Sequence, residues 1–139
     1  WVVSAGGANF INTMLKLGAE RQVLKVVHDQ IGCPSSANDI ADALLTVAQN
    51  LGGRGGTWHY VNDGDASWYD LAAYVFAETA RRNWASPTLK PITSEEYPTP
   101  AKRPANSRLS INKIRTDFAI TPRPWQAAVE EILAERLNR

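Results

Sequence analysis

Residue types suited to binding an anion gather in one stretch of this 139-residue sequence. The stretch Tyr97–Leu109, called the basic loop below, contains three prolines, one lysine and two arginines. Arginine binds phosphate through two parallel hydrogen bonds, and prolines stiffen a loop so that it loses less entropy when a ligand binds. Asn106 and Ser107 add neighbouring hydrogen-bond donors. This composition is typical of an anion site, and a solvated basic surface loop is the alternative.

Other residues with potential chemistry favour structural roles. The glycine cluster Gly52–Gly56 follows a predicted helix and precedes a predicted strand, the reverse of the strand-to-helix turn that holds a nucleotide phosphate. His28 and His59, with Cys33 between them, lack the spacing of a zinc site. The turn around Cys33 places no helix N-terminus behind the sulfur, so we expect a small buried residue rather than a nucleophile. The sequence therefore predicts no metal site.

The elements that must position these residues alternate between strands and helices. Apolar residues at helical spacing predict a helix over about Asn9–Ala19, with Gly18 as its terminator, and a second helix from Ser35 or Ser36 to Leu51. Short apolar runs predict strands over 23–27 and 57–61. This alternation is typical of an α/β protein with a partly parallel sheet.

A third helix is predicted from Trp68 to about Arg82. The preceding Ser67 and the carboxylate of Asp70 have the spacing of a capping box. The apolar residues of this helix predict a buried face, whereas Glu78 is expected on the solvated side. The capping box makes this N-terminus the most sharply defined boundary in the chain.

The composition changes after Pro87, because seven of the eight prolines lie from that residue onward. We expect a brief strand over 89–92, then the basic loop, a short helix capped by Ser110, and a last helix that begins at Pro124. One face of this last helix is predicted to hold its apolar residues, Trp125, Ala128, Val129, Ile132 and Leu133. The chain is therefore divided into residues 1–86, with strands and helices of an α/β sheet, and residues 87–139, with the loop and the C-terminal helices.

Overall composition excludes several classes of protein. Apolar residues make up 44% of the chain, with five Trp, four Tyr and three Phe, which excludes a disordered tail. The longest apolar runs fall well short of the roughly 18–20 residues needed to cross a bilayer. The single Cys33 cannot form an internal disulfide, so we expect a cytoplasmic protein.

The basic loop resembles a known family. Its sequence YPTPAKRPANSRL is similar to the C-terminal signature of dTDP-4-dehydrorhamnose reductases, members of the extended short-chain dehydrogenase/reductase superfamily. Three further motifs follow the order found in that family: Asp29–Pro34 resembles its DQxGxP turn, Ser67–Asp70 its SWYD helix start, and Arg123–Trp125 its final helix start. The resemblance covers essentially the whole chain. It implies the C-terminal part of a Rossmann-like fold, with the last sheet strands and a small substrate-binding subdomain.

The resemblance implies a bacterial enzyme that reduces the 4-keto group of dTDP-4-dehydro-β-L-rhamnose with NADPH, for the synthesis of cell-surface polysaccharide. In that family a Tyr-x-x-x-Lys pair supplies the catalytic acid. The pair is absent from this sequence, because the residues four positions after its tyrosines are Gly64, Ala73, Glu78 and Ala101. Since the sequence also begins at Trp1 without a methionine, we expect a C-terminal half with no catalytic residue, inactive alone. The NADPH site would lie mainly in an N-terminal half, and the complete enzyme is expected to be a homodimer.

Within this half, the resemblance implies a site that binds the dTDP-sugar. Trp1 resembles a tryptophan beside the sugar, and Arg103 is the first choice for the diphosphate, with Lys102 as long-range attraction. The remaining candidates are Asn106 and Ser107 as neighbouring donors, and Asn9 and Gln30 for the sugar or base; the last two could equally cap a helix or stabilise a turn. Trp68 and Tyr69 are expected to pack at a helix start. Some family members bind Mg²⁺ through acidic residues, but Asn38 stands where such a ligand is expected, so no Mg²⁺ is predicted.

Two other functions remain open from the sequence. A non-catalytic regulatory relative of the same superfamily would bind a nucleotide or a partner protein without turnover. A nucleic-acid-binding module could use the basic stretch from Lys102 to Arg123 together with Trp125, but the net charge of only +1 argues against it.

Overall fold

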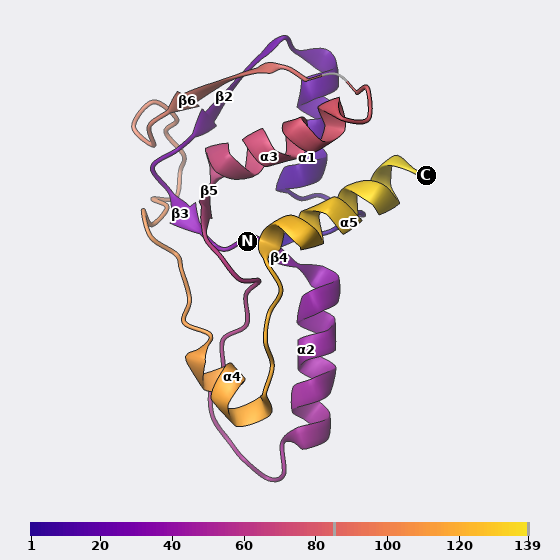
Figure 1. Ribbon diagram of the computed structural model, residues 1–139. Coiled ribbons are helices and arrows are strands. Elements are labelled where there is room, and N and C mark those ends of the chain that lie inside the picture. The colour runs from indigo at the N-terminus through magenta and orange to yellow at the C-terminus, as the bar shows by residue number, and fades with distance from the viewer. Residues whose placement is uncertain (85, 139) are drawn as a thin grey trace.

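The chain has an α/β fold, described here for residues 1–84 and 86–138 of a computed structural model. In Figure 1 the upper part holds the paired strands β2 (Val23–Val27) and β6 (Thr88–Ile92) with helices α1 (Phe10–Glu20), α3 (Trp68–Ala80) and α5 (Trp125–Leu137). Helices α2 (Ala37–Asn50) and α4 (Asn112–Phe118) extend below it. The described strands form three two-stranded sheets. This arrangement confirms the α/β class and the partly parallel sheet predicted from the sequence.

The longest strand pair joins the two parts of the sequence. β2 (Val23–Val27) pairs in parallel with β6 (Thr88–Ile92) over five residue pairs. Leu24 and Val26 alternate with exposed neighbours along β2 and pack against α1 and α3 through a cluster with Met14, Ala72 and Phe76. The predicted strands over 23–27 and 89–92 are therefore confirmed.

Two short sheets bring the N-terminus beside the turn that follows β2. β1 (Val2–Val3) pairs in parallel with β4 (Ser35–Ser36), and the carbonyl of Trp1 accepts a hydrogen bond from the amide of Ser35 at 2.7 Å. β3 (Ile31–Gly32) pairs antiparallel with β5 (Ala66–Ser67), which leads directly into α3. The start of the chain, the turn and the start of α3 therefore meet at one place.

Helix α1 (Phe10–Glu20) begins where the sequence predicts, with Asn9 as its N-cap. The expectation that Gly18 terminates this helix is wrong. Gly18 lies inside α1 and is buried, and a Cβ atom there would come within 2.5 Å of the Phe76 ring. Glycine is needed at this position because α3 packs closely against α1, and the helix continues two residues further.

Helix α3 (Trp68–Ala80) has the predicted capping box. The hydroxyl of Ser67 accepts from the amide of Asp70, and the carboxylate of Asp70 accepts from the amide of Ser67. The expectation of a solvated Glu78 is wrong, because this side chain is buried and forms an ion pair with Arg81 in the next turn. The charged partner on the same helix allows the carboxylate to lie against the core.

The lower part holds α2 (Ala37–Asn50), capped by Ser36, and α4 (Asn112–Phe118). Gly52 and Gly53 follow α2 with positive φ angles, as a helix stop requires. The predicted strand over 57–61 is wrong: this segment forms no ladder with any described residue. Its alternating sequence fits a strand, but a strand exists only with a partner. Ile111 occupies the N-cap position of α4, and the hydroxyl of the predicted cap Ser110, one residue earlier, accepts from the amide of Asn112 at 3.4 Å.

Helix α5 (Trp125–Leu137) closes the core. Its buried residues are the predicted ones, Trp125, Ala128, Val129, Ile132 and Leu133. Four of these five pack with Val3, Ile11, Leu71 and Val75 in the larger hydrophobic cluster. None of the helices in the described ranges is both long and apolar enough to cross a membrane.

Candidate functional site

The C-terminal end of the basic loop is fixed to β3 by its backbone. The amide of Ile31 donates to the carbonyl of Ala105 at 2.8 Å, and the amide of Ser107 donates to the carbonyl of Ile31 at 2.8 Å. The Ser107 hydroxyl also donates to that carbonyl at 3.2 Å. These bonds extend the β3 edge by a parallel bridge between Ile31 and Asn106, so the loop returns to the body beside the turn after β2.

Arg108 strengthens this attachment, although it was not among the site residues predicted from the sequence. Its guanidinium forms an ion pair with Asp65 at 2.8 Å. Its Nε and its backbone amide both donate to Oδ1 of Asn106, at 3.0 and 3.1 Å. Asn106 therefore uses its oxygen within the protein, which leaves its Nδ2 group to donate to a ligand.

The N-terminal end of the loop is attached through Ser94. The amide of Ser94 donates to both oxygens of the Asp29 carboxylate, at 2.9 and 3.0 Å, and its hydroxyl donates to the same group at 2.7 Å. These backbone and side-chain hydrogen bonds lower the pKa of Asp29 below its ordinary value. The loop is thus tied to the body at both ends, on either side of the turn Asp29–Gly32.

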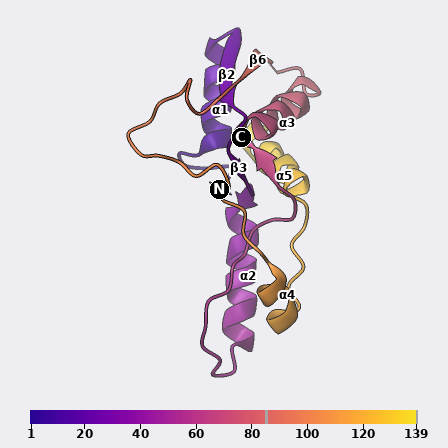
Figure 2. The ribbon, with the colours of Figure 1, turned by 90° about the vertical axis from the view of Figure 1, so that its left-hand side faces the viewer.

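Between these ends the loop stands away from the body (Figure 2). Lys102 and Arg103 lie on this outer part and are exposed. Within residues 1–84 and 86–138, neither side chain forms a hydrogen bond or an ion pair. The outer part of the loop therefore presents two free cationic groups on a backbone stiffened by prolines, the arrangement that suits an anion.

Trp1 lies at the foot of the loop, where it stacks on Trp68. The two indole rings are almost parallel, 8° apart, with centroids at 3.5 Å. Phe10 contacts Trp68 at 4.7 Å in a tilted arrangement. The Trp1 indole also lies directly against Gly32, because a Cβ atom there would come within 2.5 Å of the ring and 2.7 Å of the Ser107 hydroxyl. The glycine of the turn is required for this close approach.

Gln30 belongs to the same cluster. Its Oε1 accepts from the indole N–H of Trp68 at 3.1 Å, and its Nε2 donates to the Ser94 hydroxyl at 2.9 Å. The structure therefore brings Trp1, Gln30 and Ser107 together, with Asn106 next to them. The polar atoms of Gln30 both have partners in the protein, so for a ligand it retains only a second proton on Nε2 and a second lone pair on Oε1.

Asn9 has a different position and set of contacts. Its side-chain oxygen accepts from the amide of Asn12 as the N-cap of α1, and its Nδ2 donates to the carbonyls of Ser4 and Gly6. Asn12 donates to four carbonyl groups in the same turn, residues 4–7. Both amides therefore shape the turn after β1.

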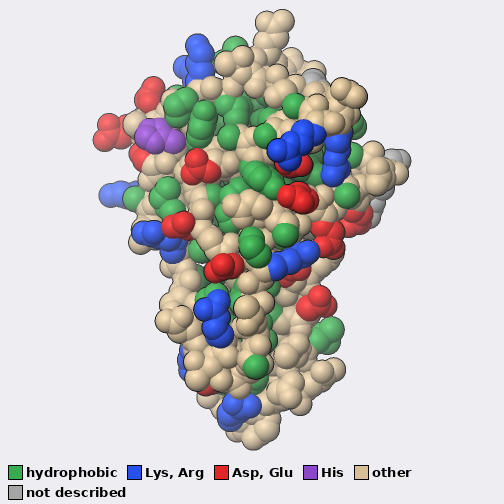
Figure 3. Space-filling view, viewed as in Figure 1, with side chains coloured by type: hydrophobic (Ala, Val, Ile, Leu, Met, Phe, Trp, Pro, Cys, Tyr) green, Lys and Arg blue, Asp and Glu red, His purple; other side chains and the backbone are tan. Residues whose placement is uncertain are grey.

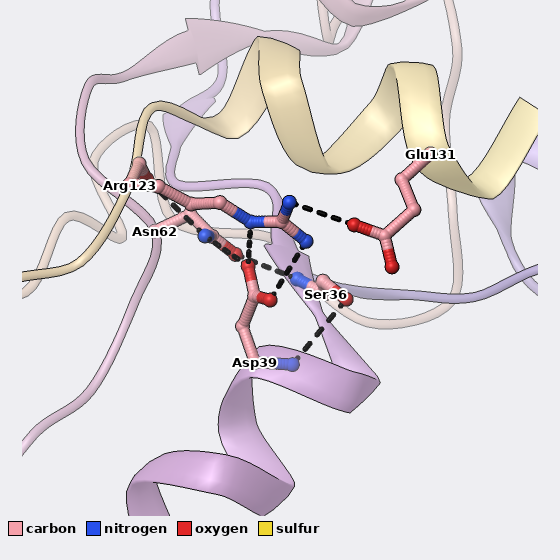
Figure 4. A network of polar contacts seen from close by, with 5 residues as sticks. All are labelled: Ser36, Asp39, Asn62, Arg123 and Glu131. Carbon is pink, nitrogen blue, oxygen red and sulfur yellow. Dashed lines mark hydrogen bonds and ion pairs between the residues drawn. The ribbon is translucent and has the colours of Figure 1, made fainter.

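A second polar cluster has a structural character (Figure 4). Arg123 donates to both oxygens of Asp39, at 2.9 and 2.8 Å, and forms an ion pair with Glu131 at 2.7 Å. The fully buried Asn62 donates to Asp39 at 2.6 Å and accepts from the amide of Ser36 at 2.8 Å. The cluster joins the start of α2 to α5 and to the segment before α3.

The charges in this cluster shift each other's titration. Burial would raise the pKa of Asp39, but hydrogen bonds from Arg123 and Asn62 outweigh burial and lower it. The hydrogen bond to Asp39 correspondingly raises the pKa of Arg123. Burial, together with the nearby Asp39 carboxylate, raises the pKa of Tyr60 to about 12. Asp39 and Arg123 bind each other, and Asn62 and Glu131 complete their contacts, so the cluster stabilises the fold.

The surface in Figure 3 carries side chains of both charge signs. Asp and Glu lie among the Lys and Arg side chains on this face, so the view contains no continuous basic track such as a nucleic-acid backbone requires. Among the described residues, no group of three or more His, Cys, Asp or Glu side chains could hold a metal ion. The free cations on the basic loop are thus better suited to a small anionic ligand.

Sequence reasoning missed the contribution of Trp68 and the attachment through Arg108. Trp68 stands in the capping motif, so its type was explained as packing at a helix start. Arg108 lies inside the basic loop, but its position beside Asp65 depends on the pairing of the loop with β3. One available signal was the turn Gln30–Gly32, since a glycine next to a polar residue in a turn often permits close approach of another group.

Comparison with known sequences identifies the family to which the chain is similar. Residues 1–138 match the family described as RmlD substrate binding domain. The chain is 41% identical over 140 residues to dTDP-4-dehydrorhamnose reductase of Shigella flexneri, a match that covers 97% of this chain and 47% of the relative. The chain thus spans about half the length of the curated relatives that it matches.

Solved structures show the same similarity. The chain superposes with a TM-score of 0.87 and 35% identity on a dTDP-4-dehydrorhamnose reductase from Clostridium acetobutylicum, covering all of this chain and 47% of that one. The corresponding enzyme from Bacillus anthracis, in complex with NADP, gives a TM-score of 0.86 with 29% identity, covering 97% of this chain and 45% of that one. The described fold is therefore similar to about half of an extended short-chain dehydrogenase/reductase.

Proposed function

The chain belongs to the RmlD substrate binding domain family, that of the dTDP-4-dehydrorhamnose reductases, and we propose that it forms the substrate-binding half of an NADPH-dependent enzyme of this kind. The complete enzyme would reduce the 4-keto group of dTDP-4-dehydro-β-L-rhamnose to give dTDP-L-rhamnose. The product would serve bacterial cell-surface polysaccharide, and we propose a cytoplasmic homodimer, as the family resemblance implies. Residues 1–86 would supply the last strands and helices of the sheet, and residues 87–139 the loop and helices that hold the substrate.

The basic loop carries this proposal. Its two ends are attached at Ser94 and Asn106, while Lys102 and Arg103 between them remain without protein partners among the described residues. An unpaired guanidinium on a stiffened loop supports binding of a diphosphate, because two parallel hydrogen bonds form without breaking an existing ion pair. Lys102 would add attraction at longer range.

The foot of the loop supports binding of the sugar. Trp1 is half-buried, and an indole ring beside a sugar provides an apolar surface that matches the faces of the ring. Asn106 would donate through Nδ2, and Ser107 would accept through its hydroxyl oxygen, because its proton is directed to Ile31. We assign smaller roles to Gln30 and Asn9, whose amide groups already have protein partners.

The described residues do not fit a dinucleotide cofactor. A nucleotide phosphate needs a glycine-rich turn from a strand into a helix, but Gly52–Gly56 follows α2 and leads into an extended segment. The Bacillus anthracis relative, whose structure contains NADP, is about twice as long as this chain. We therefore propose that this chain binds the sugar nucleotide and that NADPH is held mainly by an N-terminal half.

Titration with dTDP tests the proposal directly. We expect the complete protein to bind dTDP, and Arg103→Ala to weaken that binding about tenfold, the loss of roughly 1.4 kcal/mol that one charge-assisted contact contributes. Binding of NADPH should be unchanged. Arg21→Ala removes another exposed arginine, at the end of α1, and serves as the matched control. Equal losses for dTDP and NADPH would refute a specific diphosphate contact.

Activity distinguishes the enzyme from a regulatory relative. The complete protein should oxidise NADPH in the presence of dTDP-4-dehydro-β-L-rhamnose, and the 139-residue chain alone should not. A complete protein that binds dTDP without turnover would be a regulatory relative. Measurable turnover by residues 1–139 alone would overturn the assignment of a substrate-binding half.

A further inference from the structure

We propose that Trp68 is a positioning residue for Trp1, and that Gln30 links this stacked pair to the start of the basic loop. The structural part of this inference depends only on the described contacts. Its consequence for catalysis depends on the proposed function, because Trp1 is assigned there to the sugar. The experiments below separate these two parts.

The orientation of Trp1 is determined by two contacts. Trp68 covers its ring at 3.5 Å and nearly parallel, and the bare backbone of Gly32 lies against its edge atoms Cε2 and Nε1. Trp68 itself is on the first turn of α3, directly after the capping serine Ser67. Because the capping box fixes this turn, Trp68 offers Trp1 a rigid surface.

The hydrogen bonds around Gln30 can run in only one direction. An indole N–H only donates, so Trp68 requires the oxygen of Gln30 as its acceptor. The Gln30 amide therefore directs its NH₂ group to the Ser94 hydroxyl, which must accept. The single Ser94 proton then goes to the Asp29 carboxylate, an acceptor only. Because the Trp68 indole can only donate and the Asp29 carboxylate can only accept, the direction of every hydrogen bond between them is fixed.

This chain of bonds joins a rigid helix to the base of a loop that stands away from the body. Ser94 lies two residues after β6 and three before the basic loop begins at Tyr97. A shift of the loop at Ser94 would turn the Gln30 amide, and the bond from Gln30 to Trp68 would transmit that shift to the indole under Trp1. The side chains of Trp68 and Gln30 thus couple the loop to the position of Trp1.

The first experiment needs no ligand. Two stacked indoles give an exciton couplet in circular dichroism. The couplet of this protein is the part of the signal that is lost both in Trp1→Phe and in Trp68→Phe. We expect Gln30→Leu and Ser94→Ala to reduce this couplet, although neither residue is an indole. Gln49→Leu and Ser110→Ala, which replace exposed residues of the same types, should leave it unchanged. An unchanged couplet in both Gln30→Leu and Ser94→Ala would overturn the link to the loop.

The second experiment measures catalysis in the complete protein. We expect Trp68→Phe, which keeps an aromatic ring but loses the N–H donor, to lower kcat/KM for the dTDP-sugar about fivefold, as the loss of one hydrogen bond predicts. The double variant Trp1→Phe/Trp68→Phe should be no worse than the poorer single variant, because both act through the Trp1 ring. If the fold losses in kcat/KM of the two single variants multiply in the double variant, the positioning role is overturned. If the wild-type protein shows no turnover, the proposed function fails, while the couplet still decides whether the structural link exists.

Discussion

Arg103 and Arg123 both lie in the proline-rich C-terminal part of the chain, yet their surroundings are opposite. Arg123 contacts the carboxylates of Asp39 and Glu131, and its side chain is 37% exposed. Arg103 is exposed and has no side-chain partner among residues 1–84 and 86–138. Arg108 is intermediate, with one carboxylate partner, Asp65, and 52% exposure.

The comparison separates two uses of the same side chain. A guanidinium that already makes bidentate bonds to a carboxylate cannot bind a phosphate without losing them, so Arg123 stabilises the fold. A free guanidinium contributes little to stability and keeps its donors for a ligand. We therefore expect the contribution to the free energy of unfolding to decrease in the order Arg123, Arg108, Arg103. The contribution to binding of dTDP should increase in the same order.

The largest expected effect is on the Arg123 side of this comparison. Asp39→Ala should lower the free energy of unfolding by about 3 kcal/mol, because Arg123 and the buried Asn62 both lose their acceptor. Urea denaturation of the complete protein measures this change. Asp42→Ala, which replaces an exposed carboxylate on the same helix, is the control and should cost under about 0.5 kcal/mol. Equal losses in the two variants would contradict a stabilising role for the cluster.

The lowered pKa of Asp39 predicts a dependence on pH. Its folded-state pKa lies below the unfolded value of about 3.9, so its stabilisation is complete above that pH and is lost as the pH falls through the folded-state pKa. Asp39→Asn removes this titration. Between about pH 5 and pH 2 the unfolding free energy should therefore fall less in Asp39→Asn than in wild type. If the unfolding free energies of wild type and Asp39→Asn change with pH in parallel, Asp39 does not contribute to the pH dependence of stability.

Arg108 should show a smaller effect on stability. Asp65→Ala removes its exposed ion pair, and pairs of this kind contribute about 0.5 kcal/mol. The more informative result concerns the loop, whose C-terminal end would then be held by the bonds of Ala105 and Ser107 to Ile31. Limited proteolysis within Tyr97–Leu109 should accelerate in Asp65→Ala. An unchanged rate would show that the bonds to Ile31 are enough to hold the loop.

Arg103→Ala should change the free energy of unfolding least, by under about 0.5 kcal/mol, since no described contact is lost. In wild type, dTDP should protect the loop from proteolysis, and Arg103→Ala should weaken that protection. Thermal denaturation and digestion of the same samples measure both properties. A large loss of stability in Arg103→Ala would remove the distinction between the two arginines.

Local signals allowed much of the fold to be predicted. The capping box of Ser67 and Asp70 and the apolar face of α5 depend on neighbours along the chain, and both are correct. Gly18 and Glu78 were misassigned because their surroundings are created by packing: the ring of Phe76 covers the glycine, and Glu78 is buried beside its Arg81 partner. The segment 57–61 has the alternation of a strand but pairs with no strand among the described residues.

The candidate site could be predicted only in part. The composition of the basic loop indicated the free cations, and the family resemblance indicated Trp1 and Gln30 as candidate residues. The stacking of Trp1 on Trp68 depends on residues at opposite ends of a long stretch of sequence, brought together by the pairing of β3 with β5. No periodicity in the sequence carries that information.

The parallel pairing of β2 with β6 has a consequence for how the chain folds. Val23 pairs with Thr88, so the register forms only after residues 28–87, including α2 and α3, have been enclosed in the connection. Contacts of such high sequence separation form slowly, because the entropy of closing a long loop is lost before the strands can bond. Ser94 lies two residues after β6, so its bonds to Asp29 and Gln30 should form late. During synthesis the loop would remain open to proteases until this step is complete.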